Sequence, residues 1–197
     1  MLDFFFHLRD HIGLALVALG AALALGIPLG AFAARTPGAR AVTLGAVGVG
    51  RVVPSLAVLA LMLPLVGVGF LPAAIALALL AIPPIALNTD LGLRGVPAAV
   101  RDAARGLGMS EREIRARIDW PLALPIVFSG IRTAAVEVVA SATLAAFIGG
   151  GGLGEYIVNG IALNDTGLLL EGAVAVGGLA LAVQAALALV ERRLARA

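Results

Sequence analysis

The sequence is 197 residues long, 61% hydrophobic and 13% charged, with a formal net charge of +2 and a mean hydropathy of +1.06. Soluble domains are about 45–50% apolar and about 25% charged, so this chain has too few polar side chains to cover a water-facing globule. Cysteine is absent, which excludes disulfides, thiolate metal sites and a catalytic thiol.

Five apolar segments of about 20 residues or more predict five membrane-spanning helices and an all-α, polytopic membrane protein. In chain order they cover residues 12–34, 42–66, 71–91, 122–148 and 168–190. The prolines inside the first three are Pro28, Pro54, Pro64, Pro83 and Pro84. Helix bundles tolerate such breaks because neighbouring groups satisfy the freed backbone. The N-terminus lacks the basic start and cleavage site of a secretory signal, so we expect the first span to be retained.

Arginine is distributed unevenly between the two ends of these spans. The first loop carries Arg35 and Arg40, residues 94–117 carry six arginines, and the C-terminal tail carries three more. The opposite side has Arg9, and residues 149–171 contain acidic side chains but no arginine. The positive-inside rule therefore predicts an outside N-terminus and a cytoplasmic C-terminus. This placement also accounts for the isoelectric point of about 10.4 without nucleic-acid binding.

Residues 94–121 form a polar segment between the third and fourth spans. The stretch VPAAVRDAARGLG predicts a short helix that ends at Gly106 or Gly108. In SEREIRARI, Ser110 is a candidate N-cap and Glu113 completes a capping box, which predicts a second helix. Pro121 is expected to hold Trp120 in an extended conformation and so to end the segment. The helix pair is either a docking element for a partner or a solvated interfacial segment.

This segment resembles the cytoplasmic EAA loop of ATP-binding-cassette importer permeases: Glu-Ala-Ala, three residues, Gly, nine residues, Ile-x-Leu-Pro. The matching positions are Asp102, Ala103, Ala104, Gly108, Ile118 and Pro121. Asp102 replaces the usual Glu, and Trp120 replaces the Leu. In that family the loop forms coupling helices that sit in a groove of the ATPase subunit. The resemblance therefore implies an ATPase-coupling role for these residues, with Asp102 at the acidic position and Gly108 at the tight turn.

Two longer stretches, VVPSLAVLALMLPLVGVGFLPAAIAL and GIRTAAVEVVASATLAAFIGGGGLGEYIVNGI, extend the resemblance to the osmoprotectant permeases. These import glycine betaine, choline, carnitine and related solutes. The resemblance implies one permease domain over residues 1–197 with a methionine-importer-like (type I importer) fold. It also implies a second permease chain, identical or different, a cytoplasmic ATPase dimer that binds ATP and Mg, and an extracytoplasmic solute-binding protein.

Three alternatives remain open. The same fold would serve for an amino acid, taurine or an inorganic anion. A non-transporting membrane scaffold would use the polar segment to dock some other partner. A free-standing secondary carrier would work without any ATPase.

No nucleotide, catalytic or metal site is expected in this chain. GGGGLG at residues 149–154 fits G-x-G-x-x-G, but a membrane span rather than a strand precedes it, which favours an extracytoplasmic turn. A P-loop requires lysine, and the chain has none, so ATP hydrolysis must come from another polypeptide. His7 and His11 are spaced for a metal but lack further ligands nearby, so we expect both to be interfacial.

Glu137 lies well inside the fourth predicted span, where a carboxylate is costly and is a functional candidate. Three alternatives stay open for this side chain. It faces a water-filled path, it pairs with Arg51 or Arg132, or it hydrogen-bonds within the bundle while protonated. The further polar or helix-breaking positions on the second to fourth spans are Pro54, Ser55, Asn88, Thr89, Ser141 and Thr143. The resemblance implies that these spans line the translocation pathway, so some of the seven are expected to be wet. Hydrogen bonding between helices is the alternative.

Aromatic residues are scarce, which bears on solute recognition. Quaternary ammonium groups are held by aromatic faces through cation–π attraction. Trp120 falls in the polar segment and Tyr156 is the single tyrosine, so these two cannot form a tight cage, although the seven phenylalanines offer a weak one. We therefore expect high-affinity recognition in the separate binding protein and a low-affinity passage here.

Overall fold

The computed structural model describes residues 2–194, with all side chains in that range except those of Leu2, Arg51 and Leu194. Its elements are α1 (Leu2–Ala33), α2 (Pro37–Val52), α3 (Ser55–Val66), α4 (Phe70–Arg94), α5 (Ala98–Gly106), α6 (Glu111–Ile114), the π-helix η1 (Arg115–Asp119), α7 (Trp120–Ser141), the 3-10 helix η2 (Ala142–Ile148), α8 (Gly154–Leu163) and α9 (Thr166–Leu194). Four helical stretches within these residues are long and apolar enough to cross a membrane, and the bent pair α2–α3 would be a fifth if it forms one span. The predicted all-α polytopic class is confirmed.

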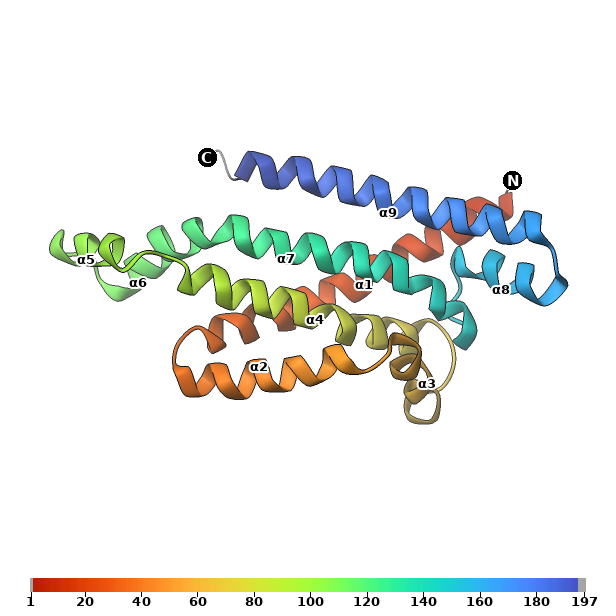
Figure 1. The fold of residues 1–197 in the computed structure, drawn as a ribbon, viewed down its shortest axis with the longest axis horizontal. Helices are drawn as coiled ribbons and strands as arrows, with labels where there is room; N and C mark the ends of the chain where they lie inside the picture. Colours follow the sequence, from red (N-terminus) through yellow and green to blue (C-terminus); the bar gives the residue numbers. More distant parts are fainter. Residues whose placement is uncertain (1, 195–197) are drawn as a thin grey trace.

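The bundle is elongated, and its two ends differ (Figure 1). One end, which we call the α5 end, holds α5, α6, the turn between α1 and α2, and the C-terminal part of α9. The opposite end, the α8 end, holds the start of α1, α3 and α8. The arginine-rich first loop, polar segment and C-terminal region therefore lie together at the α5 end.

The second predicted span is two helices rather than one. Thr36 caps α2 by accepting a hydrogen bond from the Ala39 N–H at 3.1 Å, and α2 ends at Val52. Val53 is extended (φ −74°, ψ 124°), Pro54 precedes α3, and the two helices meet at 90°. Proline has no N–H and disfavours helical geometry at the preceding residue, so the chain breaks here instead of bending within one helix.

Helix α4 forms the centre of the bundle, between α1 and α7 (Figure 1). Two thirds of its most apolar window is buried, against 6% for α9. Small residues allow the neighbours to approach closely. A Cβ on Gly130 of α7 would lie 2.5 Å from the Asn88 Cβ and 2.7 Å from the Pro84 carbonyl oxygen of α4.

We expect Gly130→Ala to lower the free energy of unfolding by about 1–3 kcal/mol, because the added methyl group forces α4 and α7 apart. Gly20→Ala on α1 is the matched control, since its Cβ would have no neighbour within 4 Å. That substitution is expected to be neutral or to stabilise the helix by up to about 1 kcal/mol. Thermal unfolding in detergent measures both, and equal melting temperatures for the two variants would contradict this packing.

The predicted end of the polar segment at Pro121 is wrong. Trp120 is helical (φ −65°, ψ −49°), and its N–H donates to the Arg115 carbonyl across the π-helix η1. The wider π turn shifts the hydrogen-bond ladder by one residue just before Pro121, so the missing proline N–H does not stop the helix. From Glu111 to Ile148 the chain is one continuous helical stretch, and the second polar helix is an extension of the fourth span.

The glycine run at the α8 end forms a turn, followed by α8, which the sequence does not predict. Gly149, Gly151 and Gly152 all have left-handed φ values, +72°, +76° and +89°. Helix α8 then has ten residues and ends at Asn164, whose φ is 54°. Ten residues are too few to span a bilayer, which is why a search for long apolar windows misses this helix.

His11 is buried, contrary to the interfacial position expected from sequence. Its Nε2 donates to the Val139 carbonyl at 3.0 Å, and its ring packs against Gly152 of the glycine turn. His7 lies four residues earlier and pairs with Glu155 of α8 at 2.9 Å. Across the described part of the chain, no group of three or more His, Cys, Asp or Glu side chains is placed to hold a metal ion.

Candidate functional site

The turn between α5 and α6 is a glycine-dependent helix end. The Met109 N–H donates to the Ala104 carbonyl at 3.1 Å, and the Gly108 N–H donates to the Arg105 carbonyl at 2.9 Å. This pair of bonds is a Schellman motif, with Gly108 left-handed at φ +82°. A side chain at a left-handed position costs about 1–2 kcal/mol, so glycine suits this turn. Gly108 therefore lies in the turn that the resemblance assigns to it.

The start of the second polar helix follows the predicted capping box. The Ser110 hydroxyl accepts a hydrogen bond from the Glu113 N–H at 3.3 Å. The Glu113 carboxylate accepts hydrogen bonds from the Ser110 N–H at 3.0 Å and from its hydroxyl at 2.8 Å. This prediction is confirmed, and it fixes where α6 begins relative to the Gly108 turn.

Arg105 joins the two helices across the turn. Its guanidinium contacts Asp102 of α5 and Glu111 of α6, each at 2.8 Å. The hydrogen bond to Glu111, the charge of Glu111 and the hydrogen bond to Asp102 together raise the pKa of Arg105 above its usual value. Exposed ion pairs stabilise little, so we expect this cluster mainly to fix the angle of the helix pair.

The helix pair is braced to the spans by Arg101 of α5. Its Nε donates to the Asp119 carboxylate at 2.7 Å, and a terminal nitrogen donates to the Leu93 carbonyl at 2.7 Å. Asp119 precedes α7 and is 11% exposed, and Leu93 lies at the end of α4. Arg101 therefore ties α5 to the end of α4 and to the residue that precedes α7.

The six motif positions are arranged around this brace. Asp102, Ala103, Gly108 and Pro121 are exposed, Ala104 is buried and Ile118 is half-buried. Asp102 is the charged residue among the exposed motif positions, and 68% of its side chain is accessible. The exposed positions thus include both ends of the motif.

A polar cavity of about 360 Å³ lies where the α2–α3 break meets α4 and α7. Its lining is Gly50, Val52, Val53, Pro54, Ser55, Leu80, Pro84, Thr133, Glu137 and Ser141. Thr133, Glu137 and Ser141 are spaced by four residues and so share one face of α7. Thr133 is missed by the sequence prediction, although its spacing of four from Glu137 is the signal that would have found it.

Four of the seven predicted pathway residues meet in this cavity: Pro54, Ser55, Glu137 and Ser141. The other three hydroxyl or amide groups bond to carbonyls three or four residues earlier in the chain. Asn88 donates to Pro84 at 2.8 Å, Thr89 to Ile85 at 2.8 Å, and Thr143 to Ala140 at 2.7 Å. These are local bonds and not the bonds between helices that were the stated alternative, and none of the three residues lines the cavity.

The structure places Glu137 on the wall of the polar cavity and leaves its pairing with Arg51 and its hydrogen bonding open. Arg132 pairs with Glu191 of α9 at 2.6 Å, which gives that arginine another partner. The Arg51 side chain lies outside the described residues. Glu137 itself is on the cavity wall beside Ser141.

A family model described as "Binding-protein-dependent transport system inner membrane component" matches residues 26–196. The chain belongs to this family. It is therefore a multi-pass inner-membrane permease, and the predicted resemblance is confirmed.

The most similar relatives of this permease include proteins named for osmoprotectants. The carnitine transport permease protein OpuCB of Listeria monocytogenes is 42% identical over 185 residues, covering 94% of this chain and 85% of that protein. The choline transport system permease protein OpuBB of Bacillus subtilis is 39% identical, with the same coverage of both chains. An osmoprotectant import permease of Salmonella typhimurium, OsmW, is 38% identical over 170 residues, which is 84% of this chain and 79% of the relative.

Solved structures share the fold of this permease. An inward-facing form of the MetNI methionine transporter superimposes with a TM-score of 0.84 at 21% identity, covering 98% of this chain and 97% of the other. An amino acid ABC transporter crystallised with histidines gives a TM-score of 0.81 at 19% identity, covering 96% and 93%. At these identities the likeness shows the fold alone, and it confirms the methionine-importer-like architecture.

Proposed function

We propose that this permease is the membrane-spanning subunit of an ATP-driven importer of glycine betaine, choline, carnitine or similar osmoprotectants. The names of its 38–42% identical relatives support the solute class. The observation that carries the coupling role is the Arg101 brace, because it joins an exposed helix pair to α4 and α7, which line the polar cavity.

The partners follow from this role. A cytoplasmic ATPase dimer binds ATP and Mg and grips α5 and α6. A second permease chain, the same or different, completes the translocation path. An extracytoplasmic binding protein delivers the solute. This orientation places the α5 end, with its arginine-rich loops, in the cytosol and the N-terminus outside.

The transport step is a rigid displacement passed along helices. When the ATPases close, α5 and α6 move together because Arg105 links them. Arg101 carries that movement to the end of α4 and the start of α7. The cavity wall formed by α4 and α7 then shifts relative to the α2–α3 break, which is a shear-type change of access.

The cavity chemistry supports low affinity for the solute. It offers one carboxylate, Glu137, with the Ser55, Ser141 and Thr133 hydroxyls. Its described lining contains no aromatic ring, so the strong cation–π attraction available to a quaternary ammonium group is missing there. Affinity is therefore expected to come from the binding protein, while the cavity lets the solute pass.

The test is uptake into proteoliposomes that contain the permease, its ATPase and its binding protein. We expect labelled choline, betaine or carnitine to accumulate only when ATP is present in the compartment that the ATPase faces. Without the ATPase, accumulation is expected to fall to background. Accumulation of taurine, an amino acid or an inorganic anion instead would replace the proposed solute class. Uptake that persists without the ATPase would contradict coupled transport, and no uptake of any solute with all three components would favour the scaffold alternative.

A further inference from the structure

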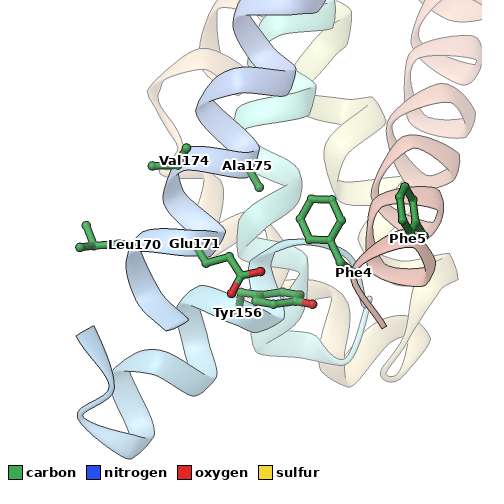
Figure 2. A pocket seen from close by; sticks show the side chains of 7 residues that line it. All are labelled: Phe4, Phe5, Tyr156, Leu170, Glu171, Val174 and Ala175. Atoms are coloured by element: carbon green, nitrogen blue, oxygen red, sulfur yellow. The ribbon is translucent and has the colours of Figure 1, made fainter. Parts of the chain in front are cut away.

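A second cavity, of about 720 Å³, lies at the α8 end, between the first turns of α1, helix α8 and the start of α9 (Figure 2). It is lined by Phe4, Phe5, Tyr156, Leu170, Glu171, Val174 and Ala175. None of these residues lines the polar cavity beside Glu137. Its volume falls in the range of about 300–1,000 Å³ that is typical of small-molecule sites.

Aromatic rings that are far apart in the sequence meet in this cavity. The Phe4 and Tyr156 rings are 6.1 Å apart and nearly perpendicular, at 73°, and Phe5 lies 6.0 Å from Phe4. The His7 ring packs edge-on against Tyr156 at 5.2 Å and is itself held by Glu155. The chain thus gathers its one tyrosine and two phenylalanines at one place, a partial cage that composition alone does not reveal.

Close packing of α8 on α9 places a carboxylate beside these rings. A Cβ on Gly172 would lie 2.7 Å from the Tyr156 Cβ, so the two helices touch at this point. Glu171 precedes Gly172, and Figure 2 shows its carboxylate next to Tyr156, with the Phe4 ring nearby. Leu170 and Val174 point outward at the rim of the cavity and are 54% and 73% exposed.

Acidic charges act on the tyrosine of the cavity. Burial raises the pKa of Tyr156, and the charges of Glu171 and Asp3 raise it further. Arg9, the arginine at this end of α1, pairs with Asp10 at 3.0 Å and lies over Phe6. Among the described residues, no arginine or histidine forms an ion pair with Glu171.

We propose that this cavity binds an alkylammonium group. Aromatic faces attract a soft organic cation, and a carboxylate supplies the opposite charge. The apolar rim contacts methyl or acyl carbons attached to the ammonium group. A free solute and an amine-bearing lipid headgroup both present this chemistry at a membrane surface. The site is additional to the proposed transport path, because its lining residues belong to α1, α8 and α9 and not to the polar cavity.

The first arm of the test titrates the full-length permease in phosphatidylglycerol nanodiscs with choline and, separately, with its neutral isostere 3,3-dimethyl-1-butanol. For a free solute we expect choline to bind at least about tenfold more tightly than the isostere. Glu171→Gln and Tyr156→Leu are each expected to weaken choline binding about tenfold, whereas Tyr156→Phe keeps it. Phe147→Leu, at an exposed site outside the cavity, is the control and is expected to bind choline as the parent chain does.

The second arm uses nanodiscs that contain equal amounts of phosphatidylcholine and phosphatidylglycerol, with the retained lipids counted by native mass spectrometry. Retention of phosphatidylcholine that is lost in Glu171→Gln identifies a lipid headgroup as the occupant. Glu171-dependent binding of choline in the first arm identifies a free solute. If neither choline nor phosphatidylcholine depends on Glu171, the proposal is overturned. No ATPase takes part in either arm, so this failure is distinct from a failure of coupled transport.

Discussion

Replacing Gly108 by valine is expected to lower solute uptake about tenfold while membrane insertion stays normal. Gly108 has φ +82°, where a β-branched side chain is strained by about 1–2 kcal/mol or more. No neighbour lies within 4 Å of a Cβ built there, so the effect comes from the backbone alone. We expect the turn to open, α5 to tilt away from α6 and ATPase binding to weaken. Uptake in proteoliposomes and co-purification of the ATPase measure the two consequences.

The controls separate conformation from bulk. Gly108→Asn is expected to keep most of the activity, because asparagine tolerates the left-handed conformation. Gly106→Ala places a methyl group in equally open space on a helical backbone and is expected to transport normally. Normal uptake by Gly108→Val would show that the turn does not couple the permease to its ATPase.

Glu137→Gln is the second substitution for which we expect a large loss, about tenfold in uptake. The side chain lies on the wall of the polar cavity, between Thr133 and Ser141 on the same face of α7. Hydrogen bonds to a charged group are worth about 1.5–3 kcal/mol, and tenfold corresponds to about 1.4 kcal/mol. The loss is expected in transport and in solute-stimulated ATP hydrolysis, with binding of the ATPase unchanged.

Thr143→Val is the matched control for Glu137. Thr143 was predicted from sequence for the same pathway, but its hydroxyl bonds to the Ala140 carbonyl and it does not line the cavity. We therefore expect valine at this position to leave uptake within about twofold of the parent chain. Equal losses in Glu137→Gln and Thr143→Val would mean that the cavity does not mark the path of the solute.

Local signals in the sequence were sufficient for several elements. The capping box at Ser110 and Glu113 depends on side-chain chemistry within four residues, and it forms as predicted. The long apolar segments predict α1, α4, α7 and α9, because a spanning helix needs about 20 apolar residues. Gly108 is also recognisable, since a glycine two residues past the end of a helix is a common stop signal.

Features that depend on hydrogen-bond register or on distant contacts were not predictable. The break at Val53 and the continuous helix at Trp120 both precede a proline, yet one interrupts the helix and the other does not. Pro54 follows an extended residue and Pro121 follows a π turn, and local sequence does not specify which arrangement forms. His11 is buried because the glycine turn near residue 152 folds onto it, a contact between residues 141 positions apart.

The candidate cavity shows the same limit. Glu137 and Ser141 were predictable from their position in a span, and Pro54 and Ser55 from the helix break. Their convergence depends on the angle of α3 against α7, which comes only from the packed bundle. Asn88 and Thr89 were equally polar in the sequence, but they bond to carbonyls on their own helix.

The central claim is that α5 and α6 protrude into the cytosol and are held there by an ATPase, and a single introduced cysteine tests it most directly. The chain has no native cysteine, and Leu107, in the turn after α5, is 84% exposed. We expect Leu107→Cys to react with a membrane-impermeant maleimide from the cytosolic side only, and to be protected when the ATPase is bound. An Asn164→Cys control at the α8 end is expected to react from the outside. Labelling of Leu107→Cys from the outside, or no protection by the ATPase, would contradict the account.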